Sequence, residues 1–287
     1  MAKRLKSHLM LLSAALIWGC AFVAQSVGME HVGPWTFTCL RSFLAGFALL
    51  LFRPFLVEKK ENKNHPNLVI KAGIVCGIFL TLASIFQQYG IQTTTVGKAG
   101  FITTLYVIFV PMIAVFLGKK ISLYKWIAVF LALAGLYFLS MKGSFVLARG
   151  DFLVVVSALF FAWHILVIDY FIPHVDGVTM SCVQFFVVGI LCLFPMLYFE
   201  HPAFTQIQSA LIPILYAGLF SSAIGYTLQI LGQKNAEATV ATILLSLESV
   251  FAAIAGYFLL HETLSQRELF GCALLFMAML IAQGQKD

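Results

Sequence analysis

Long apolar runs separated by short polar joints dominate the pattern of this chain. Ten such runs occur, at 9–27, 34–52, 69–89, 97–117, 123–140, 152–171, 178–199, 211–231, 238–260 and 267–284. A helix needs roughly 20 apolar residues to cross the ~30 Å hydrocarbon layer of a bilayer. The pattern therefore predicts an all-α integral membrane protein with ten transmembrane helices.

The joints between these runs leave no room for a soluble domain. The longest polar joint, RPFLVEKKENKNHPN, follows the second run, and shorter ones read GKK and MKGSFVLARGD. The N-terminal stretch has basic residues before an apolar run, as a signal peptide does, but it lacks a clear small-residue cleavage site and its apolar part is long enough to span. We interpret it as the first transmembrane helix.

One phrase occurs twice along the chain. HVGPWTFTCLRSF begins at His31, and HVDGVTMSCVQFF begins at His174, 143 residues later. Further on, GIFLTLASIFQQ (77–88) resembles GLFSSAIGYTLQ (218–229). Each half then holds five runs, an odd number, so the second half enters the bilayer from the opposite side. The sequence predicts two inverted five-helix repeats, residues 1–141 and 142–287.

Inverted repeats are frequent in secondary transporters, because two similar halves can exchange conformations and open a midplane site to either face. An ancestral duplication without transport is the alternative that symmetry leaves open.

Composition supports the membrane assignment. Hydrophobic residues make up 61% of the 287 residues and charged residues 10%, against roughly 45–50% and about 25% in soluble domains. Most of the 18 Lys and Arg lie in short loops, so the net charge of +6 orients the chain rather than binding nucleic acid. With the N-terminus inside, only Lys98, Lys142, Arg149 and Arg267 fall outside and Arg41 lies within the membrane, which predicts cytoplasmic termini.

Signs of an enzyme or a metal site are missing from the sequence. The six cysteines lie in apolar runs without metal-ligand spacing. HETLS (261–265) lacks the second histidine of a zinc protease, and neither GxxxxGK[ST] nor GxSxG occurs. We expect neither enzymatic activity, nor a cofactor or metal, nor a nucleic-acid partner.

Several stretches, in order, resemble the EamA-like members of the drug/metabolite transporter superfamily: LLSAALIWGCAFVAQ, TFTCLRSFLAGFALL, KAGFITTLYVIFVPMIAVFLGKK, WIAVFLALAGLYFLS and ATILLSLESVFAAIAGYFLLHETLS. The resemblance covers nearly the whole chain and implies two EamA-like repeats in a ten-helix bundle that exports small metabolites such as amino acids without ATP hydrolysis. One departure is LESV where many relatives have LEPV, which puts a kink near Ser249 in doubt.

Polar side chains inside apolar runs mark a candidate substrate cavity, because burying them in a bilayer is costly. Thr81, Ser84 and Gln88 share one helix face, as do Ser222, Tyr226 and Gln229 in the equivalent run. We expect Gln88 and Gln229 to line one central cavity; the alternative is that these stripes bond neighbouring helices.

Three ionisable residues lie at membrane depth. Glu248 can carry a proton, hold a substrate ammonium group or pair with Arg41. Arg41, whose repeat equivalent is Gln184, is predicted to be a buried partner for a carboxylate of the protein or of the substrate. His164 titrates near neutral pH, so it is either a proton or substrate contact or a structural group satisfied by a neighbour.

Aromatic residues complete the candidate cavity. Trp18, Tyr106 and Tyr226 are predicted to form an aromatic-lined pocket, although packing or lipid contact is the default role of each. Pro111 removes a backbone hydrogen bond within the fourth run and predicts a kink or a gating point.

The leading hypothesis is a secondary active transporter in the plasma membrane, or inner membrane of a bacterium, that exports small metabolites such as amino acids by alternating access. Transport of sugars, nucleotide-sugars or drugs is the alternative within this class, and a non-transporting scaffold or lipid-interacting protein is the alternative outside it. The expected partners are a small-molecule substrate and membrane lipid. Proton coupling and the choice between monomer and homodimer stay open.

Overall fold

The computed structural model describes residues 2–56, 66–94, 96–140, 149–260 and 265–283. Throughout these ranges the regular elements are helices, and no strand occurs. Several predictions lie outside the described residues, namely the lysines at 59, 60, 63, 142 and 286 and most of the HETLS segment.

Six helices are continuous rods. They are α1 (Ala2–Gly28), α2 (Pro34–Leu56), α3 (Pro66–Ile91), α6 (Leu123–Ser140), α7 (Arg149–Phe171) and α14 (Gln266–Gln283). Four further helices are built from consecutive segments in the described residues: α4 (Val96–Thr103) with α5 (Tyr106–Phe116), α8 (Gly177–Pro195) with η1 (Met196–Glu200), α10 (Leu211–Leu215) with η2 (Tyr216–Tyr226) and α11 (Thr227–Gln233), and α12 (Ala238–Leu245) with α13 (Glu248–Leu260). The short helix α9 (Phe204–Ser209) connects η1 to α10. Both η segments are π-helices.

Each predicted apolar run falls on one of these rods or segmented helices. Seven helices in the described part of the chain are long and apolar enough to cross a membrane: 3–28, 34–56, 66–91, 99–116, 149–171, 177–200 and 211–233. Shorter apolar helices cover the other three runs, at 123–138, 238–252 and 269–281. Length and composition therefore support a membrane-spanning helical protein.

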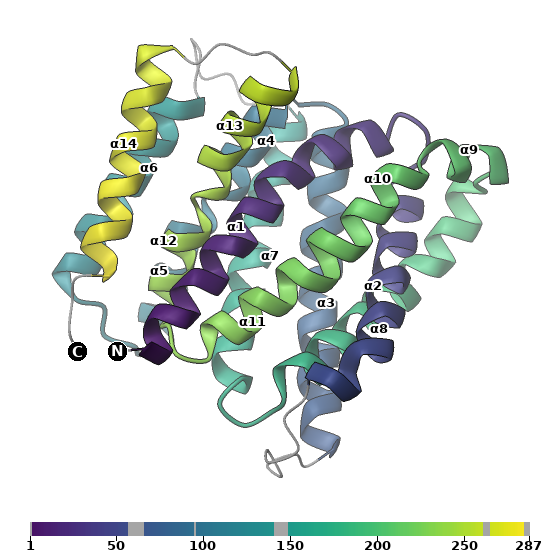
Figure 1. Cartoon of the computed structure of the whole chain (residues 1–287), viewed down its shortest axis with the longest axis horizontal. Coiled ribbons are helices and arrows are strands. Elements are labelled where there is room, and N and C mark those ends of the chain that lie inside the picture. The colour runs from purple at the N-terminus through teal and green to yellow at the C-terminus, as the bar shows by residue number, and fades with distance from the viewer. Residues whose placement is uncertain (1, 57–65, 95, 141–148, 261–264, 284–287) are drawn as a thin grey trace.

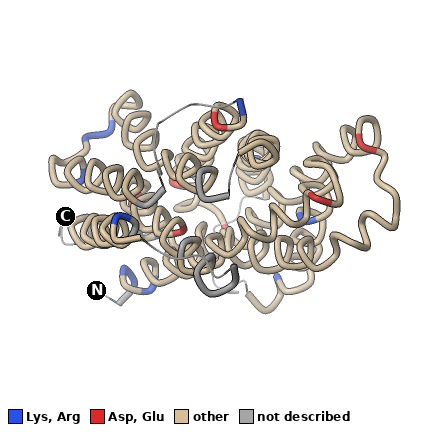
Figure 2. The backbone as a smooth tube through the Cα atoms, turned by 90° about the horizontal axis from the view of Figure 1, so that it is seen from above, with Lys and Arg blue, Asp and Glu red and all other residues tan. Residues whose placement is uncertain are grey.

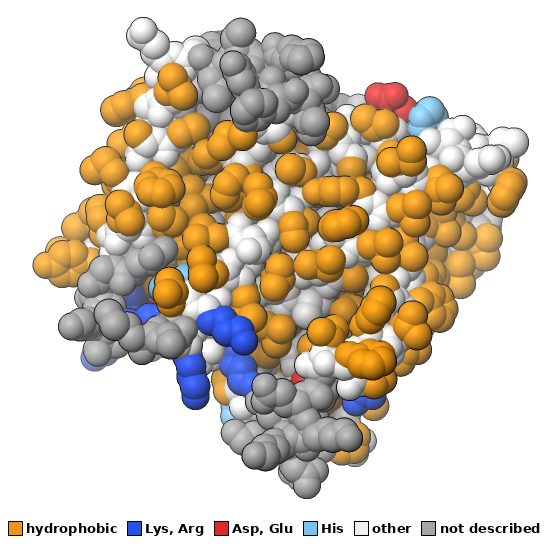
Figure 3. All heavy atoms as spheres, viewed as in Figure 1, with side chains coloured by type: hydrophobic (Ala, Val, Ile, Leu, Met, Phe, Trp, Pro, Cys, Tyr) orange, Lys and Arg blue, Asp and Glu red, His pale blue; other side chains and the backbone are white. Residues whose placement is uncertain are grey.

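The outer surface of the bundle is apolar. Large hydrophobic side chains point outward along most helices, with Phe55 and Phe116 83% and 86% exposed. Figure 3 shows hydrophobic side chains across the middle of one face, with lysine and arginine side chains gathered at one edge. In Figure 2 most charged residues lie at helix ends or in connections. Lipid tails can cover such a surface, whereas in water it would be an aggregation site.

The second helices of the two halves pack side by side and antiparallel. α2 contacts α8 along its length. The start of α2 meets the end of η1, where the Glu200 carboxylate accepts hydrogen bonds from the backbone N–H groups of Trp35 (2.9 Å) and Thr36 (2.7 Å). At the other end Arg53 Nε donates to Thr179 Oγ1 over 2.9 Å.

Residues of the duplicated phrase hold this pair together by reciprocal contacts. Cys39 Sγ lies 3.5 Å from the Gly189 carbonyl oxygen, and Cys182 Sγ lies 3.5 Å from that of Gly46. The missing side chain at each glycine admits a phenylalanine ring of the other helix, Phe186 at Gly46 and Phe43 at Gly189. The repeated residues are therefore those that build the α2–α8 interface.

Other helices pair in the same manner across the halves. α6 packs against α14, α3 against α7, and α1 against η2 and α11. Figure 1 shows α1 and the α10–η2–α11 helix crossing the near side of the bundle, with α6 and α14 together at one edge. The start of α1 and the end of α14 lie on the same side of the molecule (Figure 1).

Candidate functional site

Two helices that pass through the middle of the bundle are interrupted. Thr104 and Leu105 separate α4 from α5, and Ser246 and Leu247 separate α12 from α13. At each break the hydroxyl donates a hydrogen bond to the carbonyl oxygen three residues earlier, over 2.7 Å for Thr104 and 2.8 Å for Ser246. Such side-chain bonds can compete with the helical backbone pattern, and one accompanies each break.

The two breaks occupy equivalent places in the two halves. Tyr106 begins α5 and Glu248 begins α13, 142 residues later, and the same offset relates Thr104 to Ser246. The Tyr106 hydroxyl donates to Glu248 Oε1 over 3.0 Å, and both side chains are buried. α4 packs against α13, and α5 against α12. Equivalent residues therefore meet where the two interrupted helices cross.

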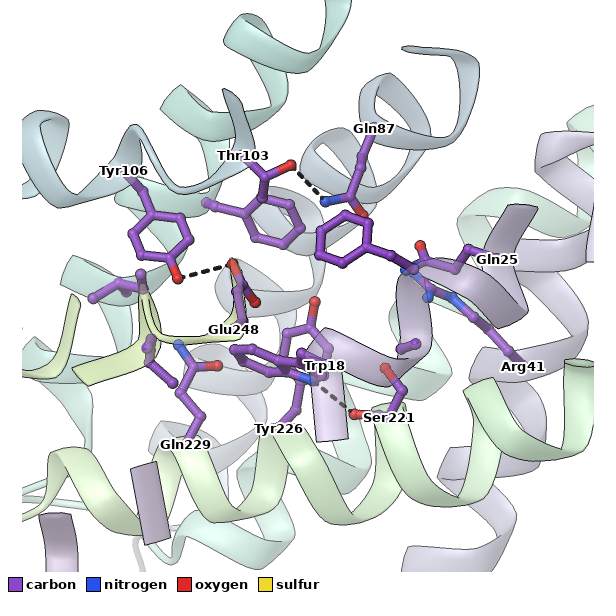
Figure 4. Close-up of a pocket in the computed structure, with 15 residues that line it drawn as sticks. Trp18, Gln25, Arg41, Gln87, Thr103, Tyr106, Ser221, Tyr226, Gln229 and Glu248 are labelled. Atoms are coloured by element: carbon purple, nitrogen blue, oxygen red, sulfur yellow. Dashed lines mark hydrogen bonds between the residues drawn. The ribbon is translucent and has the colours of Figure 1, made fainter. Parts of the chain in front are cut away.

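A small cavity of about 40 Å³ lies at this crossing, with room for a few water molecules. Side chains from α1, α2, α3, α4, α5, α7, η2, α11, α12 and α13 enclose it (Figure 4). The lining residues are Trp18, Ala21, Phe22, Gln25, Arg41, Gln87, Thr103, Tyr106, Phe161, Ile165, Ser221, Tyr226, Gln229, Leu245 and Glu248. A metabolite would need the bundle to open from this closed arrangement.

Glu248 supplies the acidic group of the cavity. It is 3% exposed, and the Tyr106 hydroxyl is the hydrogen-bond donor to its carboxylate among the described residues. As the first residue of α13 it lies at a helix N-terminus, where the helix dipole favours negative charge. The salt bridge to Arg41 that the sequence left open is not formed, because within the described ranges Arg41 has no carboxylate oxygen within 4.0 Å.

Arg41 supplies the basic group. This side chain of α2 is 4% exposed; its Nη2 donates to Ser84 Oγ over 3.2 Å, and its Cζ lies 5.9 Å from the centre of the Phe37 ring. Its Nε–H has no acceptor in the part of the chain that the structure describes. The cavity therefore carries one basic and one acidic side chain that are not paired with each other.

Aromatic rings form one wall. The Trp18 and Tyr226 rings are 4.7 Å apart between centroids, and Trp18 Nε1 donates to the Ser221 carbonyl oxygen over 3.1 Å. Figure 4 shows Gln229 beside them, on the same helix as Tyr226. If the bundle opens, a cavity with charged groups and an aromatic wall can hold a small solute that has both charged and apolar parts.

Comparison with known proteins identifies the family. The model of the EamA-like transporter family matches residues 5–141 and again residues 148–283. The chain belongs to the EamA-like transporter family. It is therefore a multi-pass membrane transporter, and its family is one of transporters, not of enzymes.

Relatives of this EamA-like transporter are similar over nearly the whole of this chain. An uncharacterized transporter of Archaeoglobus fulgidus is 31% identical over 97% of this chain and 86% of its own. The uncharacterized transporter YoaV of Bacillus subtilis is 26% identical over 94% of each chain. The WAT1-related protein At3g02690 of Arabidopsis thaliana, described as chloroplastic, is 27% identical over 93% of this chain and 67% of its own.

A protein of known crystal structure shares the fold. It is 16% identical to this chain, and it superposes with a TM-score of 0.78 over 96% of both chains. Because the identity is so low, this likeness concerns the fold alone.

Six of the predicted cavity residues of this EamA-like transporter lie together at the crossing. These are Trp18, Arg41, Tyr106, Tyr226, Gln229 and Glu248. They come from five different helices. The sequence predicted that they lie together only because polar and aromatic groups within apolar runs were expected to converge on one cavity.

Gln88 and His164 lie outside the cavity lining. Both are fully buried. His164 Nε2 lies 3.0 Å from Gln184 Oε1, and its ring contacts Tyr226 edge-on at 5.9 Å between centroids, so it stands behind the aromatic wall. Neither polar atom of the Gln88 amide has a partner among the described residues.

The cavity is also lined by four polar residues that the sequence interpretation passed over: Gln25, Gln87, Thr103 and Ser221. Gln87, next to Gln88, donates from Nε2 to Thr103 Oγ1 over 3.0 Å, and Gln25 reaches in from α1. An amide within an apolar run was the signal for both glutamines. The helix-face pattern selected Gln88, whereas its neighbour Gln87 lines the cavity in this arrangement.

The helix breaks do not fall where proline would place them. Pro111 lies inside α5, and the interruption of that helix comes earlier, at Thr104 and Leu105. In the ninth run Ser249 stands where many relatives have proline, yet the helix is interrupted just before it. Hydroxyl side chains at Thr104 and Ser246 accompany both breaks, so neither break requires a proline.

The described residues contain no group of three or more His, Cys, Asp or Glu side chains placed to hold a metal ion. All six cysteines are free thiols. Two of them, Cys39 and Cys182, serve the α2–α8 interface.

Proposed function

We propose that this protein is a secondary active transporter that exports a small metabolite, such as an amino acid, by alternating access. The observation that carries the proposal is the central cavity, which holds one acidic and one basic side chain at the crossing of two interrupted helices. Interrupted helices at a repeat interface are a recurrent way to build a transport site at the bilayer midplane.

Two inverted five-helix repeats, residues 1–141 and 142–287, are the second part of the proposal. Antiparallel packing of α2 and α8, the reciprocal cysteine and phenylalanine contacts between them, and the equivalent breaks at Thr104 and Ser246 support it. A two-fold relation of this kind lets one half adopt the conformation of the other, which exchanges an inward-open for an outward-open state.

The proposed orientation has both termini in the cytoplasm of the cell, with the chain in the plasma membrane or the inner membrane of a bacterium. The start of α1 and the end of α14 lie on one side (Figure 1), and the exposed Lys3, Lys6 and Lys234 lie at the same edge as the start of α1. Such an edge fits the rule that lysine and arginine collect in cytoplasmic loops.

A zwitterion with an apolar body is the kind of substrate that this cavity favours. Arg41 and Glu248 offer one charge of each sign, and the Trp18–Tyr226 wall offers apolar contact. Both charges lack an ionic partner among the described residues, so a ligand with the complementary charges would lower the cost of burying them. Amino acids fit this description better than sugars or nucleotide-sugars do.

We also propose that Glu248 carries the coupling proton. A buried carboxylate with only a tyrosine hydroxyl as partner is more stable neutral in a membrane, and it can lose its proton when a cationic group of the substrate arrives. His164 is the second candidate, but it stands behind Tyr226 and does not line the cavity.

The test is flux in proteoliposomes loaded with a panel of the common amino acids, measured with and without a pH gradient. We expect saturable flux of at least one amino acid, accelerated by the gradient. Glu248→Gln should abolish the acceleration, whereas His164→Ala should retain it. Absence of flux for every amino acid, together with absence of thermal stabilisation by any of them, would refute the amino acid proposal and favour a sugar, drug or lipid-interacting role.

A further inference from the structure

Among the residues that the structure describes, no acidic side chain pairs with Arg41. Its guanidinium has one neutral hydroxyl acceptor, Ser84 Oγ, and one aromatic neighbour, the Phe37 ring. No carboxylate oxygen of the described residues lies within 4.0 Å, and the Nε–H is buried without an acceptor. An arginine at membrane depth normally pairs with an acid or lines a polar cavity, and Arg41 does the second.

The surroundings of Arg41 are also short of partners. Figure 4 shows the guanidinium reaching from α2 toward Gln25 of α1, and Gln25 Oε1 is buried without a donor. Burying a polar group without a hydrogen-bond partner is unfavourable, so Gln25 Oε1 and the Nε–H of Arg41 favour a polar occupant at this end of the cavity.

Helix packing does not require the charge. Arg41 and Gln184 follow Cys39 and Cys182 by two residues, and these cysteines make reciprocal contacts at the α2–α8 interface. In the second half the neutral Gln184 occupies the equivalent place and contacts His164 at 3.0 Å. The equivalent position of the other half is therefore occupied by an uncharged residue.

We propose that Arg41 is the residue that binds the carboxylate of the substrate, which restricts transport to solutes with a small carboxylate group. A guanidinium matches a carboxylate in shape and can donate two parallel hydrogen bonds to it. The free Nε–H provides a donor that Ser84 leaves unused. Glu248, in the other interrupted helix, is then left for the cationic end of the substrate.

This inference deepens the proposed function and rests on it. It makes Arg41 a specificity-determining residue, because solutes that differ only at the carboxylate should separate in affinity. Loss of one or two charge-assisted hydrogen bonds corresponds to about tenfold to hundredfold weaker binding.

The experiment compares acids with their carboxamides on the purified full-length protein. Thermal stabilisation in detergent and flux in proteoliposomes are measured with L-leucine, L-phenylalanine and L-threonine, with the carboxamide of each, and with benzoate as a carboxylate that lacks an amine. The variants are Arg41→Gln, which copies Gln184, and Arg41→Lys. Arg53→Gln is the matched control, since Arg53 lies on the same helix but is exposed and bonds to Thr179.

We expect the wild type and Arg53→Gln to prefer acids over carboxamides by about tenfold or more, and Arg41→Gln to lose this preference while keeping its affinity for the carboxamides. Arg41→Lys should keep a weaker preference, because lysine retains the charge but not the planar fork. If Arg41→Gln does not fold, the acid-to-carboxamide ratio of Arg41→Lys decides.

Three results overturn part of the scheme. An unchanged acid-to-carboxamide ratio in the folded Arg41 variants overturns the carboxylate site and leaves amino acid transport standing. Binding of benzoate through Arg41 without flux of any amino acid overturns amino acid export and supports the carboxylate site. No stabilisation of the wild type by any carboxylate overturns the site itself.

Discussion

α2 and α8 begin with the same phrase and pack against each other, yet they differ in two residues that matter. Arg41 of α2 lines the cavity, whereas Gln184 of α8 contacts His164 outside it. Gly33 stands before α2 where Asp176 stands before α8. The shared residues build the interface between the halves, and the differing residues decide what each half contributes.

The caps of the two helices show how the halves compensate for such a difference. Asp176 caps its own helix by accepting hydrogen bonds from the backbone N–H and hydroxyl of Thr179, at 2.7 and 2.5 Å. Gly33 has no side chain to do this, and Glu200 of the other half caps α2 in its place. A Cβ on Gly33 would lie 2.2 Å from the Glu200 carboxyl carbon, so a side chain there would displace Glu200 from the start of α2.

Moving the charge to the second half should have the largest effect. Gln184→Arg would bury a charge beside His164, in a fully buried position, and we expect a loss of about 3 kcal/mol from the cost of arginine at the centre of a span. The yield of monodisperse protein and its thermal midpoint in detergent measure this. Gln184→Met is the neutral control and should be far milder; equal stability of Gln184→Arg and the wild type would show that α8 tolerates the charge.

A smaller difference should separate two equivalent glycines. A Cβ on Gly77 would lie 2.6 Å from Val187 Cβ and 2.9 Å from the Gln184 carbonyl oxygen, whereas one on Gly218 would lie 2.6 Å from Leu44 Cδ2, the end of a flexible side chain. We expect Gly77→Ala to lower the free energy of unfolding by about 1–3 kcal/mol and Gly218→Ala to lower it by less. Unfolding in denaturing detergent measures both changes. Equal costs would contradict this expectation and would point to the backbone contacts the two sites share, the Gln184 carbonyl oxygen at 2.9 Å and the Arg41 carbonyl oxygen at 3.1 Å.

The caps can be exchanged. Glu200→Ala should cost about 1 kcal/mol, as loss of a helix cap does, and Asp176→Ala should cost a similar amount. Gly33→Asp alone should be more harmful, because it collides with Glu200. The double variant Gly33→Asp with Glu200→Ala gives α2 the cap of α8, and its thermal midpoint should exceed that of either single variant. A double variant that is less stable than both would contradict the exchange.

Substitutions at the two helix breaks should cause the smallest losses of stability, and the two losses should be equal. Thr104→Ala and Ser246→Ala each remove one hydroxyl-to-carbonyl hydrogen bond, for an expected loss of about 0.5 kcal/mol. Thermal midpoints measured side by side test this equality. A shift at one site several times that at the other would indicate that the breaks serve different roles.

Much of the fold was readable from the sequence. Apolar runs located the helices, and the residues of the duplicated phrase, such as Cys39 with Cys182, proved to be the reciprocal contacts between halves. The residues that line the cavity were predicted less accurately than the helices. Gln87 rather than Gln88 lines the cavity, because a helix that is apolar on several faces gives no periodic signal for its orientation.

Sequence alone determined that this chain is a helical membrane protein of two similar halves, since hydrophobicity and repetition are properties of the residue order itself. Only the tertiary structure decided which polar residues share a cavity and that Tyr106, not Arg41, is the partner of Glu248. The physical reason is that a hydrogen bond between residues 142 positions apart depends on how helices cross, and crossing is set by packing that no local pattern encodes.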